Sequence, residues 1–141
     1  MTIVERISTN SAPRPLGHYS QAIRAAGFIY VSGQLPLEPE KMHGQDGNPF
    51  EEQARIALHN LLAVLDAAGA KPSHVLRVTA YIVGAEHWAI FNKAYAEAFG
   101  DARPARSVVP VPALHDGHLI ELDAIALDSP DSAAGPARAA S

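Results

Sequence analysis

The chain has 141 residues, of which 48% are hydrophobic, so it is long enough to bury one core and fits one domain. Its formal net charge of −4 offers no broad basic surface, which argues against general nucleic-acid binding, and the absence of cysteine excludes disulfides, thiolate nucleophiles and cysteine-ligated metals. No apolar stretch is long enough to span a bilayer and the first residues do not resemble a secretion signal, so we expect a soluble protein of the cytoplasm.

The first predicted elements are two strands and a long loop. Residues 3–7 alternate between apolar and polar side chains, and residues 28–32 form a β-branched and aromatic run that Gly33 is expected to end. Between Gly33 and Asn48, prolines and glycines break any regular element. Loops of this length often border functional sites.

An amphipathic helix is predicted next. Asn48 is expected to cap it, Pro49 fits the first helical position, and Glu51 and Glu52 lie favourably in the first turn. Gly69 is expected to end it. Apolar residues recur along it at three- and four-residue spacing and predict one buried side: Ala54, Leu58, Leu61, Leu65 and Ala68.

The second half of the chain predicts a strand at 75–83, a helix at 88–99 that Gly100 ends, and strands at 107–111 and 119–127. The apolar side of this second helix is expected to contain Phe91, Tyr95 and Phe99.

The alternation of strands and helices favours right-handed crossovers, which place both helices on one face of a single sheet. The other face then needs a cover, and identical subunits are the simplest one. This cover would account for five apolar residues of the strands: Val78, Ala80, Ile82, Val109 and Val111. We therefore expect a homo-oligomer with sites between subunits, built from a domain of residues 1–127. Residues 128–141, rich in Asp, Ser, Pro, Gly and Ala, are expected to form a disordered tail.

Two charged residues stand out as chemical candidates. Arg106 follows a proline at the start of one apolar strand, and Glu121 lies in another. A guanidinium matches a carboxylate with two parallel donors, and a carboxylate accepts a proton from water, so this pair is suited to bind a small carboxylate and activate a water. The alternative interpretations are a surface salt-bridge partner for Arg106 and a solvated face residue for Glu121.

Seven histidines raise the question of a metal site. No pair has the i, i+4 spacing with an intervening acid that zinc hydrolase helices use, so we expect no metal. His115 and His118 flank a predicted turn and are expected to be solvated, and His59 is expected to be exposed on the first helix.

Six segments, in order, resemble the RidA/YjgF family of reactive-intermediate deaminases. The resemblance runs from about Ile7 to Ala126. Its segments are Gly17-His18-Tyr19-Ser20-Gln21-Ala22, Val31-Ser32-Gly33-Gln34-Leu35-Pro36, residues 53–69, Phe91-Asn92-Lys93-Ala94-Tyr95, Pro104-Ala105-Arg106-Ser107 and residues 120–126.

The resemblance implies a chorismate-mutase-like α+β single domain, with one mixed sheet and two helices on one face, that assembles as a homotrimeric barrel with three clefts at its subunit interfaces. It also implies hydrolysis of 2-enamine and 2-imino acids, such as 2-aminoacrylate and 2-aminocrotonate, to 2-keto acids and ammonia, without metal or organic cofactor. Arg106 would hold the substrate carboxylate and Glu121 would position or activate the water. Further cleft residues carried over from the resemblance are Tyr19, Ser32, Asn92 and the backbone of Gly33. Their ordinary roles are the alternatives: interface packing for Tyr19, a turn for Ser32 and helix bracing for Asn92.

Three positions depart from the family pattern. His18 replaces a common proline, Val108 replaces a frequent cysteine, and Pro110 stands where a charged residue is more usual. These changes allow a specialised substrate, such as an aminomuconate-type enamine, and leave the role of His18 open. Two other function classes remain: a non-catalytic trimer that binds small carboxylates, and RNA cleavage, which the acidic charge balance disfavours.

Overall fold

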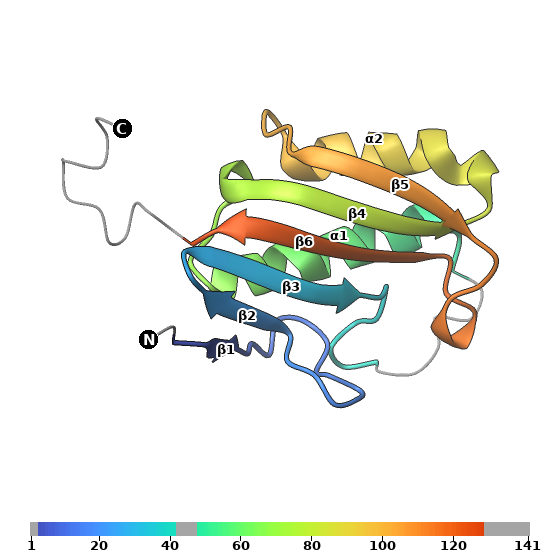
Figure 1. Ribbon diagram of the computed structural model, residues 1–141. Helices are drawn as coiled ribbons and strands as arrows, with labels where there is room; N and C mark the ends of the chain where they lie inside the picture. Colours follow the sequence, from blue (N-terminus) through green and yellow to red (C-terminus); the bar gives the residue numbers. More distant parts are fainter. Residues whose placement is uncertain (1–2, 42–47, 129–141) are drawn as a thin grey trace.

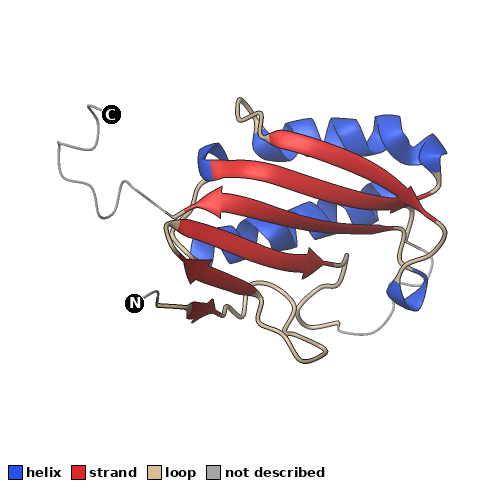
Figure 2. Ribbon diagram, viewed as in Figure 1, coloured by secondary structure: helices blue, strands red, loops and turns tan. Residues whose placement is uncertain are grey.

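The computed structural model describes residues 3–41 and 48–128, and across these residues the chain forms one six-stranded sheet with two α-helices (Figures 1 and 2). The strands are β1 (Glu5–Ile7), β2 (Ala22–Ala25), β3 (Phe28–Gln34), β4 (Val75–Val83), β5 (Ala105–Val111) and β6 (Ile120–Leu127), and the helices are α1 (Phe50–Ala67) and α2 (Trp88–Phe99). Short 3₁₀ turns occupy Pro72–His74, Ala85–His87 and His115–Gly117.

The strand order is β1-β2-β3-β6-β4-β5. β1, β2 and β3 form an antiparallel meander, β6 pairs antiparallel with both β3 and β4, and β4 pairs in parallel with β5 after the chain has passed through α2. Both helices lie on the same face of the sheet, behind it in Figure 2. The α+β class, the single mixed sheet and the one-sided helix layer are therefore confirmed. The trimeric assembly stays a prediction.

The core lies between the sheet and the helices. Alternate residues of β4 and β6 are fully buried there, including Val78, Ala80 and Ile82, and α1 packs over β3 and β6. The expectation that these three residues of β4 need a second subunit was therefore wrong, since the helices already cover them. Each large aliphatic side chain in this layer contributes about 1.5–3 kcal/mol through burial.

The two ends of α1 differ in how well they were predicted. Its first backbone hydrogen bond runs from the Gln53 N–H to the Pro49 carbonyl (3.1 Å), so Pro49 is the capping residue and the assignment of that role to Asn48 was wrong. Gly69, at φ +83°, ends the helix as expected. The N–H of Ala70 donates to the carbonyl of Leu65 (2.9 Å), which completes a Schellman motif.

β2 was not predicted. It has only four residues, and the tight turn that joins it to β3 uses Ala26 and Gly27, both at positive φ (52° and 87°). Hairpin turns of this kind usually carry Asn-Gly or Asp-Gly, because alanine rarely adopts a positive φ. Since Ala26-Gly27 stands there instead, the sequence lacks the usual signal for a hairpin.

Two other strand boundaries moved, and both bear on the site. β3 runs through Gly33 to Gln34 with a register irregularity between Val31 and Gln34, so Gly33 does not end the strand as expected. β5 starts at Ala105, two residues earlier than predicted, and it is one of the two edge strands of the sheet. An edge position explains how Pro110 is accommodated, because its missing N–H breaks no ladder bond that another strand needs.

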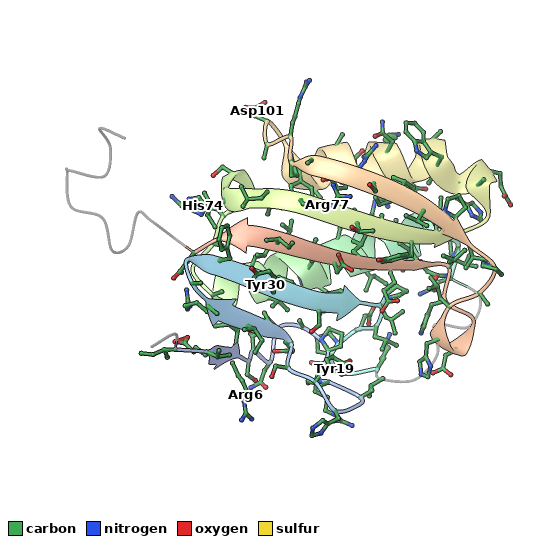
Figure 3. All side chains as sticks on the ribbon, viewed as in Figure 1. Arg6, Tyr19, Tyr30, His74, Arg77 and Asp101 are labelled. Atoms are coloured by element: carbon green, nitrogen blue, oxygen red, sulfur yellow. The ribbon has the colours of Figure 1, made fainter. Side chains whose placement is uncertain are left out.

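The face of the sheet away from the helices is mixed in character. Figure 3 shows Tyr30 and Arg77 on this face, and Arg77 donates to the Ser107 hydroxyl (2.8 Å). Burial raises the pKa of Asp123, while Arg77 and a hydrogen bond from Tyr81 act in the opposite direction. Ionisable groups on this face are thus partly withdrawn from water.

Asp128, the last described residue, is tied to the β2–β3 hairpin. Its N–H donates to the Gly27 carbonyl (2.9 Å), and its carboxylate pairs with Arg24. The remainder of the predicted tail, residues 129–141, lies outside the described residues, as do residues 42–47 of the predicted loop. Among the described helices, none combines the length and apolar character needed to cross a membrane.

Candidate functional site

Arg106 lies on β5 beneath α2. It pairs with Val78 in the parallel ladder and so projects toward the helices. Its Nη1 donates to Oδ1 of Asn92 (3.0 Å). The guanidinium carbon also lies over three aromatic rings of α2, at centroid distances of 4.7 Å for Tyr95, 5.6 Å for Phe91 and 5.7 Å for Trp88. These contacts hold the guanidinium in place from several sides.

The spacing of residues on α2 builds this arrangement. Positions 88, 91, 92 and 95 are three or four residues apart, so they share one side of the helix and meet the edge strand together. A cavity of about 450 Å³ opens beside them, and its lining includes Asn92, Tyr95, Phe99, Arg103 and Arg106. Because a guanidinium has five N–H donors, Arg106 keeps donors for a carboxylate after binding Asn92.

Tyr95 also belongs to this candidate site, although its helical spacing predicted only a core position. Its ring is buried, and its hydroxyl has no hydrogen-bond partner within residues 3–41 and 48–128. Burial raises its pKa to about 12, against the opposing effect of Arg106, so the phenol stays neutral. The three-residue spacing from Asn92 is the signal that would have identified it.

Glu121 lies on the opposite face of the sheet. It pairs with Tyr81 of β4 and projects away from the helices. A second cavity of about 490 Å³ surrounds it. The lining of this cavity includes Leu16 and His115. It also includes four of the predicted site residues: Tyr19, Ser32, Gly33 and Glu121.

Gly33 makes room for the Glu121 carboxylate. A Cβ atom at Gly33 would lie 3.0 Å from the carboxyl carbon of Glu121, which is closer than ordinary packing allows. The irregularity of β3 at this point brings the backbone up to β6, and the neighbouring Ser32 hydroxyl is held by the Ser20 carbonyl (2.6 Å). Only a residue without a side chain leaves the carboxylate where it lies.

The electrostatic surroundings of Glu121 favour the protonated form. Burial raises the pKa of Glu121 most, the charge of Asp123 raises it further, and His115 lowers it. A carboxylate whose pKa is moved toward working pH is better suited to accept a proton from water.

The histidines near this cavity differ from expectation. His115 is exposed as predicted, but it lines the Glu121 cavity, which the sequence analysis missed. His118 is only 3% exposed, so its assignment as solvated was wrong. The intervening Asp116 and Gly117 both have positive φ (52° and 71°), and this tight turn brings His118 back against the fold at the start of β6. His59 is exposed, as predicted.

Tyr19 and His18 lie in the loop before β2, and Figure 3 shows Tyr19 away from the sheet. The Tyr19 side chain is exposed, and its hydroxyl accepts the N–H of Leu16 (3.3 Å). His18 is exposed and does not belong to the lining of either described cavity, and Val108 packs against the core.

Arg106 and Glu121 are not brought together within one chain. They project from opposite faces of the sheet, and β4 separates their strands. The predicted site residues thus fall into two groups: Arg106 with Asn92, and Glu121 with its three neighbours around the second cavity. In the described part of the chain, no group of three or more His, Asp or Glu side chains is placed to hold a metal ion.

Comparison with known proteins identifies relatives along nearly the whole fold. The family model described as endoribonuclease L-PSP matches residues 9–128. A RutC family protein of Pyrococcus horikoshii is 42% identical over 122 residues, covering 86% of this chain and 96% of that protein. The 2-iminobutanoate/2-iminopropanoate deaminase of Rattus norvegicus is 38% identical over 129 residues, covering 92% of this chain and 93% of the relative.

Solved structures agree with these relatives. The crystal structure of the YjgF gene product of E. coli superposes with a TM-score of 0.81 at 32% identity, covering 87% of this chain and 98% of the other. E. coli TdcF with bound serine gives a TM-score of 0.82 at 30% identity, covering 89% of this chain and 99% of the other. Sequence and fold agree over the same residues, and the chain therefore belongs to the RidA/YjgF family.

Proposed function

We propose that this protein hydrolyses reactive 2-enamine and 2-imino acids, of the 2-aminoacrylate or 2-aminocrotonate type, to 2-keto acids and ammonia. The observation that carries the proposal is the Arg106 guanidinium, held by Asn92 and the aromatic side of α2 at the edge of a cavity. Such a preorganised guanidinium suits the carboxylate that every substrate of this class contains. The rat and mouse relatives named 2-iminobutanoate/2-iminopropanoate deaminase add support.

In the proposed reaction, Arg106 binds the substrate carboxylate and fixes the position of the adjacent C2. The enamine tautomerises to the imine, and Glu121 takes a proton from a water as the water oxygen adds to C2. The proton then passes from Glu121 to the imine nitrogen, which becomes the amine of a carbinolamine. The resulting carbinolamine then loses ammonia, which leaves the 2-keto acid, so one water is consumed for each ammonia released. General acid–base assistance of this kind contributes on the order of 10²–10⁴ in rate.

A cleft that uses both residues needs two copies of the chain. Because Arg106 and Glu121 project from opposite faces of the sheet, one copy supplies the guanidinium and another supplies the carboxylate. This arrangement supports the predicted homotrimer with sites at its interfaces.

The direct test is the release of keto acid from 2-aminocrotonate, generated in situ by a threonine dehydratase in the presence of semicarbazide as a competing trap. We expect wild type to accelerate release, Arg106→Ala to abolish the acceleration, and Glu121→Gln to reduce it strongly. Arg6→Ala, which removes an exposed arginine of β1, is the matched control and should retain wild-type rates (Figure 3).

Other outcomes point to the remaining function classes. Binding of small carboxylates without acceleration by wild type would indicate a non-catalytic binder. The description of the matching family model suggests RNA cleavage, which requires RNA binding that survives moderate salt. Because the chain has a net charge of −4, we expect weak RNA binding at low salt and no RNA binding at higher salt.

A further inference from the structure

A second guanidinium lines the cavity beside Arg106. Arg103 belongs to the same lining and is exposed. It forms no hydrogen bond or ion pair within residues 3–41 and 48–128, whereas Arg106 is held by Asn92. None of the lining residues is acidic.

Arg103 differs from the other arginines without a hydrogen-bond or ion-pair partner in the described residues, Arg6 and Arg14, because it alone shares a cavity with Arg106. Arg24 pairs with Glu5 and Asp128, Arg55 pairs with Glu51, and Arg77 donates to a serine hydroxyl. Arg103 and Arg106 line one cavity, and this chain contributes no acidic residue to that lining, so a ligand with two negative groups can pair with both guanidinium groups. A cavity of about 450 Å³ is within the range of sites that hold small molecules.

We propose that this cavity selects 2-imino acids that carry a second carboxylate, the imines derived from dicarboxylic amino acids, with Arg106 binding the C1 carboxylate and Arg103 the distal one. The inference rests on the proposed function and narrows its substrate class. The source of such a substrate is a reaction that oxidises the amine of a dicarboxylic amino acid to an imine. Because Arg103 is exposed and free of partners, its side chain can adjust to diacids of different length.

The single tryptophan provides a binding assay that does not depend on turnover. Trp88 is the only tryptophan, and the centre of its ring lies 5.7 Å from the Arg106 guanidinium carbon, so a ligand on Arg106 should change its fluorescence. The affinity of a dicarboxylate is compared with that of a monocarboxylate in two pairs of probes: 2-oxoglutarate with 2-ketobutyrate, and succinate with butyrate. Calorimetry provides a second readout.

We expect each dicarboxylate to bind about two- to five-fold more tightly than its monocarboxylate at low salt, the range of an exposed ion pair, and the preference to shrink as salt rises. Arg103→Gln should bring the two affinities together, whereas Arg6→Gln, an equal charge change on β1, should preserve the preference. Equal affinities in wild type, or a preference that persists in Arg103→Gln, would overturn the proposal.

Turnover separates this inference from the proposed function. Imines are generated from D-aspartate or D-glutamate and, in parallel, from D-alanine or D-2-aminobutyrate by the matching oxidases. A wild type that hydrolyses both sets with equal kcat/KM refutes the dicarboxylate selection and leaves the deaminase intact. A wild type that shows the Arg103-dependent binding preference but hydrolyses no imine refutes the deaminase and retains the selection.

Discussion

At the scale of single residues, the side chains that support Arg106 are as informative as Arg106 itself. The Tyr95 ring lies closest to the guanidinium, and its hydroxyl is buried without a partner in the described chain. The ring, rather than the hydroxyl, is therefore the part of Tyr95 that orients the arginine.

The different roles of the ring and the hydroxyl of Tyr95 predict different effects for two substitutions. Tyr95→Phe keeps the ring and removes an unsatisfied hydroxyl, so KM should stay near wild type and stability should be equal or higher. Tyr95→Leu loses the cation–π contact, worth about 0.5–2 kcal/mol, and should raise KM by roughly 2- to 30-fold with a smaller effect on kcat. Steady-state kinetics on 2-aminocrotonate measure both. A KM that rises equally in the two variants would instead assign the role to the hydroxyl.

Gly33 predicts a loss of activity without loss of the fold. Gly33→Ala should push the Glu121 carboxyl group away, because the new Cβ would lie 3.0 Å from its carbon. We expect kcat to fall by at least tenfold, given the 10²–10⁴ typical of general acid–base catalysis. Circular dichroism and carboxylate binding at Arg106 should be unchanged. Retained kcat in a correctly folded Gly33→Ala would show that this placement of Glu121 is not needed.

The pH profile tests the surroundings of Glu121. In the proposed mechanism the ionised Glu121 carboxylate accepts a proton, so kcat/KM should fall as the pH drops through the raised pKa of Glu121. His115 lowers that pKa, so His115→Gln should move the acidic limb to higher pH, whereas Asp123→Asn should move it to lower pH. A limb that stays in place in both variants would contradict the assignment.

The Glu121 carboxyl group also makes the free energy of unfolding depend on pH, in the direction opposite to that of an ion-paired carboxylate. Because the pKa of Glu121 is raised in the fold, the folded state binds more protons than the unfolded state between the two pKa values. Stability from this group therefore decreases as pH rises from about 4.5 through the raised pKa. Urea unfolding at neutral pH should find Glu121→Gln at least as stable as wild type.

At the scale of elements, the crossover from β4 through α2 to β5 places the residues of the proposed carboxylate site together. It aligns Arg106 beside Val78, on the face that α2 covers, and an edge strand leaves the cavity open on one side. The long loop that the sequence pointed to borders the Glu121 cavity through Leu35.

The end of α1 provides a stability prediction. Gly69 has φ +83°, which costs an alanine about 1–2 kcal/mol, so Gly69→Ala should lower the free energy of unfolding by that amount. Gly17→Ala is the matched control, since a Cβ there meets only ordinary contacts at 3.6 Å and beyond. Urea unfolding at one fixed protein concentration measures both. Equal losses in the two variants would contradict the Schellman assignment.

At the scale of the whole molecule, the two faces of the sheet divide the proposed chemistry between copies. Mixing Arg106→Ala with the strongly impaired Glu121→Gln in equal amounts, after dissociation and reassembly, should restore roughly a quarter of wild-type activity, since random pairing leaves that share of clefts with both side chains. Each variant reassembled alone should keep the low activity that it had before. No recovery in the mixture would show that a cleft takes both residues from one chain.

Much of the fold could be predicted from local patterns. Apolar spacing located both helices, and runs of β-branched residues located the longer strands. The turn at Ala26 lacks the usual hairpin residues, which is why β2 was missed. His118 was misjudged because its burial depends on the path of a turn and not on its neighbours in sequence.

The sequence by itself determined the class of fold, the family and the types of side chain available for chemistry, because periodicity, turn residues and ordered motifs are local properties of the chain. Only the tertiary structure decided which of these side chains meet. Strand order and register put Arg106 and Glu121 on opposite faces, joined Tyr95 and Arg103 to Arg106, and brought His115 to Glu121. Contacts between different elements depend on which strands pair and which face a helix covers, and spacing within one element does not encode them.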